Sequence, residues 1–487
     1  MRDQAALGDG VRPRDWAILG AILVVALVAR LVGLNGPLWF DEIISFDTHL
    51  SLPWGQMMQS YSMNHHYFYD VQAKLVMGLF GDAPWVVRVP ALLFGLGAIA
   101  AMWVLARQIS GVWIAHLVAL LLAVSFHHIW FSQNARGYSE LAFWSSVGMI
   151  LFLRGLAVPS WRLWIGFGLC LAAATYTHLT GAFFFAALGL IWLVVLVQRR
   201  AEAALLWRPL VGAAVGVGLL VAVYAPLIPS LRTTVGGIAG TSAVDVMQEY
   251  QNPVWTVVEA VRTGVGGAGP LVSLLAVAVV GLSLLGGIIS ARRAPWFAVA
   301  VLAHILLTMA VLMALGMRVW PRFFFVDIGF LMLLVVLGVQ ALCSGAARLT
   351  DRSGWAGPGF TLAAVAMVGV SLGLAAKNYR APKQDLVGAI ALVSSLRAAG
   401  EPVYAVGPGA EAFIGHYKAD WLAITDEAGY LAARAQAGPA LFVVAFPGRI
   451  LRRYTELDAD RLSGALQEVR WLPGTLGDGA VLVLQRD

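Results

Sequence analysis

Long apolar runs constrain the fold of this chain more than any other feature of its sequence. A helix needs about 20 mostly apolar residues to cross a bilayer. Only 12% of the 487 residues are charged, against roughly 25% in soluble domains. The sequence therefore predicts a polytopic α-helical membrane protein with about eleven transmembrane helices. These helices are expected over residues 16–35, 86–106, 112–131, 139–156, 162–178, 181–197, 209–228, 270–290, 295–315, 323–343 and 357–376.

The arginines in the short loops between these runs predict how the chain crosses the membrane, because Lys and Arg gather on the cytoplasmic side. With a cytoplasmic N-terminus, the inner loops hold ten arginines and the outer short loops hold three. The sequence therefore predicts a cytoplasmic N-terminus. After an odd number of spans, the C-terminus is then expected on the extracytoplasmic side.

The composition changes after residue 376. Three short apolar runs, "EPVYAVG", "PALFVVAF" and "GAVLVLQ", are bounded by turn formers, which is typical of buried strands. The stretch "QDLVGAIALVSSLRAA" has helical periodicity. We expect a transmembrane domain over residues 1–376, with long extracytoplasmic loops at about 36–85 and 229–269. A small extracytoplasmic α/β domain is expected over residues 377–487.

The composition also argues against several classes of protein. The net charge of +6 comes from arginines spread among the loops, with no basic stripe, so nucleic acid is not an expected partner. No Cys/His cluster has the spacing of a zinc finger. No segment repeats at a fixed period, which gives little support to solenoids and inverted-repeat transporters.

Ionisable residues gather near the outer ends of the predicted spans, where they cost free energy unless they have partners or solvent. Asp41 and Glu42 follow the first run in "LWFDEIIS", and further polar residues stand in "NHHYFYD", "SFHHIWFSQNARGYSE", "YTHLTG" and "MRVWPRFFFVD". A carboxylate can deprotonate a hydroxyl, while arginines hold an anionic leaving group such as phosphate. The pattern therefore predicts an outward-facing site for a lipid that carries a phosphate.

These residues also have simpler interpretations. An Asp–Glu pair just beyond a span is often a solvated helix cap, and His178 at a helix end could be an interfacial hydrogen-bonding residue. Arg318 and Arg322 could extend to the lipid headgroups. His65 and His66 could bind a metal, but adjacent histidines on a helix point in different directions and no third ligand is evident. The gathering of these residues on one membrane face favours a functional site.

Seven segments together resemble polyprenyl-phosphate-sugar-dependent glycosyltransferases of the GT-C class. The resemblance is nearest to the branch with the protein O-mannosyltransferases, the lipid A aminoarabinose transferases and the lipopolysaccharide galacturonosyltransferases. The matches run in order from about residue 30 to residue 390, with Asn134 in place of a family acid. The segments are "LWFDEIIS", "NHHYFYDVQAKLVMGLFG", "APWVVRVPALLFGLG", "WFSQNARGYS", "TYTHLTGAFFF", "WPRFFFVDIGFLMLL" and "NYRAPKQDLVGAIALVSSL".

The resemblance implies a GT-C catalytic domain in the membrane and an enzyme that transfers a hexose or pentose. The donor would be a sugar on a polyprenyl (undecaprenyl) phosphate, and the acceptor an envelope glycan, lipid or protein. Transfer would occur with inversion on the outer face of the bacterial cytoplasmic (inner) membrane, among membrane lipids. The sugar stays open among mannose, galacturonic acid, aminoarabinose, glucose and arabinose. No cofactor is implied with certainty, although a divalent metal stays open because some members of the clan bind one.

The resemblance also implies roles for nine residues of this sequence. Asp41 would be the catalytic base, and Glu42 would orient the acceptor or support Asp41. Three arginines would bind the donor phosphate and stabilise it as it leaves, and four further residues would line the sugar or acceptor pocket. The phosphate-binding residues would be Arg136, Arg318 and Arg322, and the pocket residues His65, His66, Tyr138 and His178.

Two other functions compete with glycosyl transfer. A transporter or flippase of a lipid-linked saccharide would use the same arginines without making a bond. Transporters, however, place ionisable residues near the middle of the membrane and show internal repeats. A receptor that senses envelope glycans through the C-terminal domain gives no reason for the acids and arginines of the outer loops.

Overall fold

The structure, a computed structural model, describes residues 11–158, 160–199, 203–238, 252, 254–256, 258–259, 271–475 and 477–487. These residues form two compact units. The first, called the membrane unit, contains the described residues up to Leu34, His65–Thr233, and those from 252 to Ala376. The second, called the α/β unit, contains Asn35–Asn64, a short segment from Thr234, and Lys377–Asp487. Most of the outer loop expected over 229–269 lies outside the described residues.

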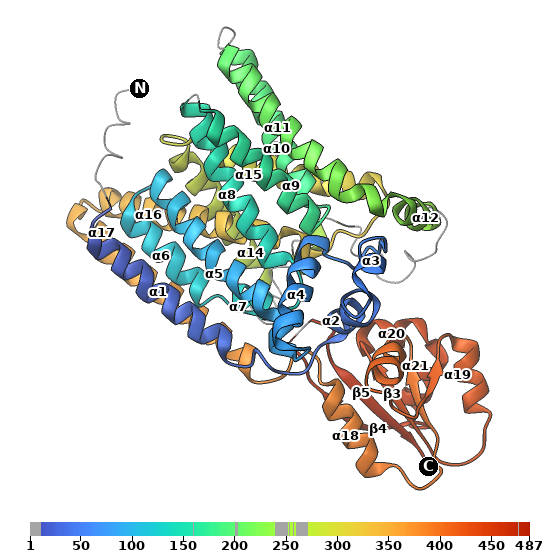
Figure 1. Cartoon of the computed structure of the whole chain (residues 1–487). Coiled ribbons are helices and arrows are strands. Elements are labelled where there is room, and N and C mark those ends of the chain that lie inside the picture. The colour runs from blue at the N-terminus through green and yellow to red at the C-terminus, as the bar shows by residue number, and fades with distance from the viewer. Residues whose placement is uncertain are drawn as a thin grey trace. The chain divides into compact units, whose positions relative to one another are not determined.

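The membrane unit is a bundle of helices (Figure 1) with one helix, or one bent pair, at each of the eleven expected runs. Within the described residues, eight helices are long and apolar enough to cross a membrane, and α6 with α7, bent by 62°, gives a ninth. Two further helices coincide with expected runs: α9 has 17 residues, and α1 carries Arg14, Asp15 and Arg30. The helices are α1 (Pro13–Leu31), α5 (Pro84–Ile109), α6 (Val112–Ala123), α7 (Phe126–Ser132), α8 (Tyr138–Ala157), α9 (Trp161–Thr177), α10 (Gly181–Gln198), α11 (Ala203–Tyr224), α14 (Leu271–Ser290), α15 (Pro295–Ala314), α16 (Ile328–Leu349) and α17 (Ala356–Ala375).

Shorter helical segments connect these helices. They are α4 (Tyr67–Phe80), α12 (Ile228–Ile238) and the 3₁₀ segments η3 (Ala225–Leu227), η5 (Pro321–Asp327), η6 (Ser353–Trp355) and η7 (Ala376–Tyr379). The segment η5 begins at Pro321, whose missing N–H costs nothing at the start of a helical turn. It leads directly into α16, and it contains Arg322.

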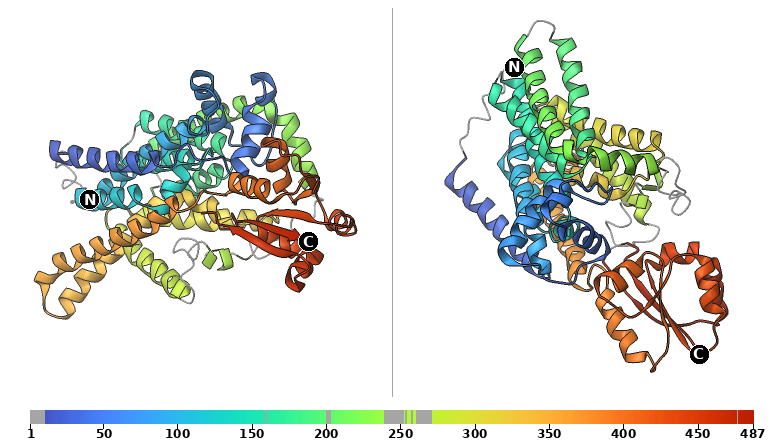
Figure 2. Two further views of the ribbon diagram at one scale, coloured as in Figure 1. Left: turned by 90° about the horizontal axis from the view of Figure 1, so that it is seen from below. Right: turned by 45° about the vertical axis from the view of Figure 1, so that its right-hand side comes forward.

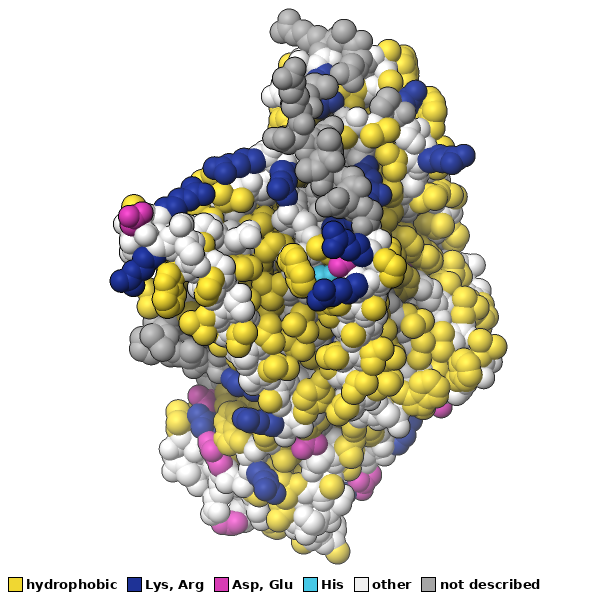
Figure 3. Space-filling view, turned by 90° about the vertical axis from the view of Figure 1, so that its left-hand side faces the viewer, with side chains coloured by type: hydrophobic (Ala, Val, Ile, Leu, Met, Phe, Trp, Pro, Cys, Tyr) yellow, Lys and Arg dark blue, Asp and Glu magenta, His cyan; other side chains and the backbone are white. Residues whose placement is uncertain are grey.

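The surface of the membrane unit is largely apolar. On the face drawn in Figure 3, hydrophobic side chains form a broad field, and Lys and Arg side chains gather above it. On α17, for example, Leu362 is 72% exposed. Contiguous apolar surface of this kind is unfavourable in water and suits a lipid environment. The predicted polytopic helical fold is confirmed, and the chain is a multi-pass membrane protein.

Close helix packing inside the bundle depends on small residues. Between α9 and α11, a Cβ atom added to Gly168 would overlap the backbone carbonyl of Gly212, and one added to Gly216 would overlap the carbonyl of Gly168. Small residues allow helices in a membrane to approach until their backbones are in contact. The backbones of α9 and α11 are therefore in contact near Gly168.

The α/β unit contains the predicted small α/β domain. Its five strands run in the order β2-β1-β3-β5-β4, with β2, β1 and β3 parallel and β5 antiparallel to both neighbours. Helix α18 covers one face and α19 to α21 cover the other (Figures 1 and 2). The elements are β1 (Val403–Val406), β2 (Leu422–Ile424), β3 (Ala440–Ala445), β4 (Gln467–Leu472), β5 (Val481–Arg486), α18 (Leu386–Leu396), the π-helical turn η8 (Glu411–His416), α19 (Glu427–Arg434), α20 (Pro447–Arg453) and α21 (Thr455–Ser463).

The segment that carries the adjacent acids also belongs to the α/β unit. It forms α2 (Phe40–Ser45), the π-helical turn η2 (Phe46–Leu50) and α3 (Trp54–Met57). The sequence prediction placed residues 36–85 together as one loop of the transmembrane domain, whereas the structure groups 35–64 with 377–487 and groups the rest with the helices. The reason is a set of contacts between α2 and residues near 383 and 416, described below.

Candidate functional site

Three aromatic side chains meet at one end of the membrane unit. His66 precedes α4, Tyr138 begins α8, and His178 follows the last residue of α9. The ring centroids of His66 lie 4.8 Å from those of both Tyr138 and His178, and the Tyr138 and His178 rings are 5.9 Å apart. The structure therefore brings together three of the four residues that were predicted to line a pocket. The fourth, His65, is buried and packs edge-on against Tyr67 at 5.8 Å.

A backbone contact fixes the protonation pattern of His66. The N–H of Gly137 donates a hydrogen bond of 3.2 Å to Nδ1 of His66, so Nδ1 carries no proton. A neutral imidazole then holds its proton on Nε2. Within the described residues, Nε2 of His66 is buried and has no hydrogen-bond partner. The site therefore contains a buried N–H group able to donate to a ligand.

Two arginines lie close enough to this cluster to affect its titration. Burial, with the positive charges of Arg136 and Arg322, holds the pKa of His66 well below its ordinary value. Burial and the same two arginines lower the pKa of His178 to about 3. Both imidazoles are therefore neutral at physiological pH, and the fixed positive charge of the cluster comes from the guanidinium groups.

The two predicted phosphate-binding arginines at 318 and 322 share one aromatic anchor. The guanidinium carbon of Arg322 lies 5.1 Å from the ring centroid of Trp320, and that of Arg318 lies 5.9 Å from it. Such contacts favour cations over aromatic faces. The next residue, Phe323, packs on His178 at 5.6 Å. These contacts place Arg322 of η5 beside the histidine cluster, although more than 100 residues of chain separate the two segments.

Arg136 lies between α7 and α8 and is only 2% exposed. The turn that precedes α8 depends on its neighbour Gly137, since a Cβ atom there would overlap Thr177 and come within 3.0 Å of Nδ1 of His66. A guanidinium group can bind an anion through several N–H donors at once. A phosphate is well suited, because the planar guanidinium can bind two of its oxygens.

Asp41 and Glu42 lie in the other unit, on the first turn of α2. They have different surroundings. Glu42 is 1% exposed; its Oε2 accepts a hydrogen bond from the N–H of Trp39 at 3.2 Å, and its Oε1 lies 3.5 Å from Nζ of Lys383. Asp41 is half-buried. The structure thus assigns Glu42 to the framework of the segment and leaves Asp41 the more accessible of the two carboxylates.

Sequence reasoning assigned no role to two buried acids that lie close in sequence to predicted site residues, Asp70 and Glu140. Asp70 accepts a hydrogen bond from the N–H of His66 at 3.3 Å. The buried Glu140 accepts hydrogen bonds from Gln72 at 2.7 Å and from Trp144 at 3.2 Å. Both acids were visible as polar residues near span ends, but only the fold shows which partners they have.

The metal ligands that the sequence left unknown are not identified by the structure. Within the described residues, no three His, Cys, Asp or Glu side chains are grouped so that they could hold a metal ion. His65 and His66, which were weighed as a metal pair, instead pack against Tyr67 and against Tyr138 with His178.

Comparison with known protein families gives one match. Residues 65–228, about a third of the chain, match the family model described as dolichyl-phosphate-mannose-protein mannosyltransferase. This region contains five of the nine predicted site residues, and the match confirms the resemblance inferred from the motifs. No curated protein matches the chain.

Solved structures of several membrane glycosyltransferases are similar in outline. ArnT from Cupriavidus metallidurans in the apo state has 16% identity and a TM-score of 0.49, with 96% of this chain and 97% of that chain covered. The Archaeoglobus fulgidus oligosaccharyltransferase, in complex with Zn and sulfate, has 13% identity and a TM-score of 0.48, with 88% and 68% covered. Arabinosyltransferase EmbB from Mycobacterium smegmatis has 16% identity and a TM-score of 0.43, with 76% and 42% covered.

Proposed function

We propose that this protein is an integral-membrane glycosyltransferase that uses a sugar linked to polyprenyl phosphate as its donor. The acceptor is an envelope glycan, lipid or protein on the outer face of the cytoplasmic membrane. The membrane unit binds the donor, and Asp41 activates the acceptor. Donor and acceptor are the partners of the enzyme, and the α/β unit lies on the same outer side.

One observation carries this proposal. Arg136 and Arg322 come close to two imidazoles that burial and these same charges keep neutral. The result is a site with fixed positive charge and an unused N–H donor on His66. A phosphate diester at the end of a lipid chain needs this combination, because its negative charge grows as the sugar leaves.

The reaction balances with the residues available. Asp41 takes the proton of an acceptor hydroxyl as that oxygen attacks the anomeric carbon of the sugar. The bond between the anomeric carbon and the phosphate oxygen breaks, with inversion, and its electrons remain on the phosphate. Polyprenyl phosphate is released with one more negative charge, which Arg136, Arg318 and Arg322 stabilise.

The family match favours this function over a flippase. The matched family is described by a transfer reaction from dolichyl-phosphate-mannose to protein, and the match includes His65, His66, Arg136, Tyr138 and His178. A flippase has no need of a general base. The accessible carboxylate of Asp41, next to the framework residue Glu42, gives the transferase its base.

The first test is a transfer assay on the full chain in lipid nanodiscs, with radiolabelled polyprenyl-phosphate sugars and envelope acceptor fractions. Asp41→Asn keeps the shape of the side chain and removes the base. Asp420→Asn, an exposed carboxylate of the α/β unit paired with Arg397, is the matched control. Transfer by the wild type and by the control, with loss of about 10²-fold or more in Asp41→Asn, supports the proposal.

Other outcomes would contradict it in different ways. Equal transfer by all three proteins keeps the enzyme class and removes Asp41 from its role. Movement of the lipid-linked sugar between leaflets, without label on any acceptor, points instead to the flippase.

A further inference from the structure

We propose that the C-terminal part of the α/β unit, residues 377–487, is a clamp for the acidic segment, residues 38–50, and that Lys383 and His416 are positioning residues for Asp41. This inference rests on the proposed function of Asp41. It gives the C-terminal domain a task within the same chain: the domain holds this segment as its ligand.

The topology of the sheet identifies a ligand site. The chain passes from β1 to β2 on one side and then to β3 on the other, so β1 lies between its two parallel neighbours. In open α/β sheets, ligands bind outside the carboxyl ends of the strands at the point where the strand order reverses. Here that point lies between β1 and β3. The loops that follow these strands lead into η8 and α20.

The acidic segment contacts both of these loops. The ring of Phe40 packs edge-on against Phe446, which follows β3, at 5.3 Å. Phe446 has a φ of 58°, a backbone conformation that costs free energy in a residue with a side chain. The α2 helix packs against η8, which follows β1. The acidic segment therefore occupies the position across the ends of β1 and β3 where a separate ligand would bind.

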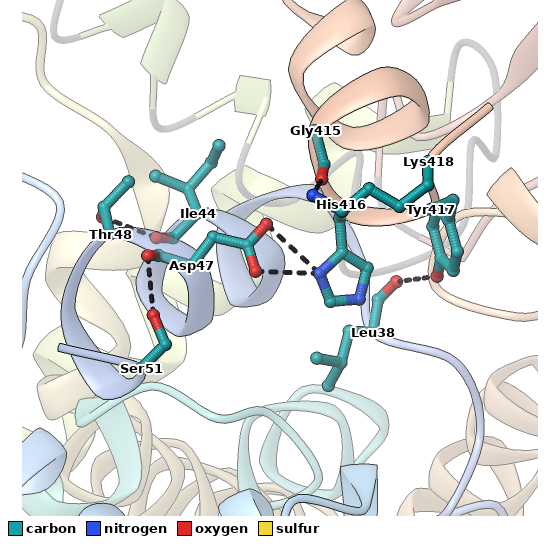
Figure 4. Close-up of polar contacts among 9 residues, drawn as sticks. All are labelled: Leu38, Ile44, Asp47, Thr48, Ser51, Gly415, His416, Tyr417 and Lys418. Atoms are coloured by element: carbon teal, nitrogen blue, oxygen red, sulfur yellow. Dashed lines mark hydrogen bonds and ion pairs between the residues drawn. The ribbon is translucent and has the colours of Figure 1, made fainter. Parts of the chain in front are cut away.

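A hydrogen-bonded pair fixes the second turn of the segment, as Figure 4 shows. Nδ1 of His416, at the end of η8, lies 2.9 Å and 3.2 Å from the two carboxylate oxygens of Asp47. The His416 ring also packs edge-on against Phe46 at 5.9 Å. The hydroxyl of Tyr417 donates to the carbonyl oxygen of Leu38 at 3.4 Å, so the contacts extend to the start of the segment.

The residues on both sides of Asp41 are held in the same way. The N–H of Phe40 donates to Oε1 of Gln384 at 3.2 Å, across 344 residues of sequence. On the other side, the buried Glu42 forms its ion pair with Lys383 at 3.5 Å. Because a buried carboxylate without its cation is costly, Lys383 ties the helix turn of Asp41 to residues 377–487.

The experiment combines an exchange measurement with kinetics on the full chain in nanodiscs. Hydrogen–deuterium exchange of residues 38–50 is compared among wild type, Lys383→Met, Lys383→Arg and His416→Ala. The double variant Asp47→His/His416→Asp swaps the positions of the two residues of the pair. Glu456→Gln weakens an exposed ion pair with Arg434 elsewhere in the α/β unit, and it serves as the matched control.

We expect hydrogen–deuterium exchange over residues 38–50 to be faster than in the wild type in Lys383→Met and in His416→Ala. It should equal the wild-type rate in Lys383→Arg, in the double variant and in the control. The kcat for transfer should fall by about tenfold in the first two variants, because small displacements of a reacting group reduce rates strongly. The donor KM should stay within about twofold, since the arginines that bind the phosphate belong to the membrane unit.

Two outcomes would overturn the clamp. Unchanged hydrogen–deuterium exchange over residues 38–50 in both Lys383→Met and His416→Ala would show that residues 377–487 do not hold the segment. Faster exchange with an unchanged kcat would show that holding it does not position Asp41. Failure of the role proposed for Asp41 is a separate result: Asp41→Asn would then transfer sugar normally, whatever the exchange measurement gives.

Discussion

The imidazole of His66 lies against the imidazole of His178, with ring centroids 4.8 Å apart, on the ends of segments that lead into α4 and out of α9. At this distance two protonated imidazoles would repel each other, so the contact favours the neutral form of both rings. Burial, and then the nearby charges of Arg136 and Arg322, lowers the pKa of both imidazoles and keeps them neutral. The contact makes the stability of the membrane unit depend on pH.

The direction of this dependence follows from the pKa of His178, which is lowered to about 3 in the folded protein. Below an unfolded value of about 6.5, the unfolded chain takes up a proton that the folded chain does not, so stability falls as pH decreases. At pH 5.5 the loss is about 1.4 kcal/mol for each such histidine. The melting temperature should therefore fall less between pH 8 and pH 5.5 in His178→Gln than in the wild type. An identical slope in wild type and variant would contradict this account.

The arginines should determine donor binding. Arg322→Ala removes a guanidinium group that faces the histidine cluster, and hydrogen bonds to charged groups contribute about 1.5–3 kcal/mol. We expect the donor KM to rise by roughly 10- to 100-fold, with partial recovery in Arg322→Lys because lysine keeps the charge without the planar fork. Arg348→Ala, at the far end of α16, is the control and should leave the KM unchanged. Equal KM values for Arg322→Ala and the control would remove Arg322 from the phosphate site.

The sequence predicted the bundle well because each span is a local property of about 20 residues. It predicted β1, β3 and β5 for the same reason, since each is a short, buried apolar run. The strands β2 and β4 were not predicted. They lie at the edges of the sheet and are largely exposed, so they lack a continuous apolar pattern.

The site was predictable only in part. The motifs identified His66, Tyr138 and His178, which the fold brings into contact. The ion pair between Glu42 and Lys383 was not predicted, because sequence periodicity carries no information about partners more than 300 residues apart. The same limit explains why the first outer loop, expected over 36–85, was not divided between two units.

The glycine before α8 should be essential to the shape of the cluster. A Cβ atom in Gly137→Ala would overlap Thr177 and crowd Nδ1 of His66. We expect the melting temperature to fall and the transfer rate to drop by about tenfold or more, because overpacking displaces neighbouring groups. The matched control is Gly189→Ala in α10, where nothing lies within 4 Å of the added atom; it should be neutral or slightly stabilising. Full activity in Gly137→Ala would show that this turn does not position His66.

A buried His–Asp pair joins the end of η5 to α15. Nδ1 of His304 on α15 lies 2.9 Å from Oδ1 of Asp327, the last residue of η5, and both side chains are buried. His304→Ala would leave a buried carboxylate without its partner, at a cost of about 3–5 kcal/mol, and would loosen the segment that carries Arg322. We therefore expect a lower melting temperature together with a higher donor KM.

The paired variant separates these two effects. In His304→Leu/Asp327→Asn neither side chain is charged, so most of the lost stability should return. The donor KM should stay high, because the contact that holds η5 is still absent. Thr308→Val, a buried change on the same helix, should alter neither quantity by much. If the KM of the paired variant returned to the wild-type value, the contact would serve stability alone and η5 would be held by Trp320 and Phe323 without it.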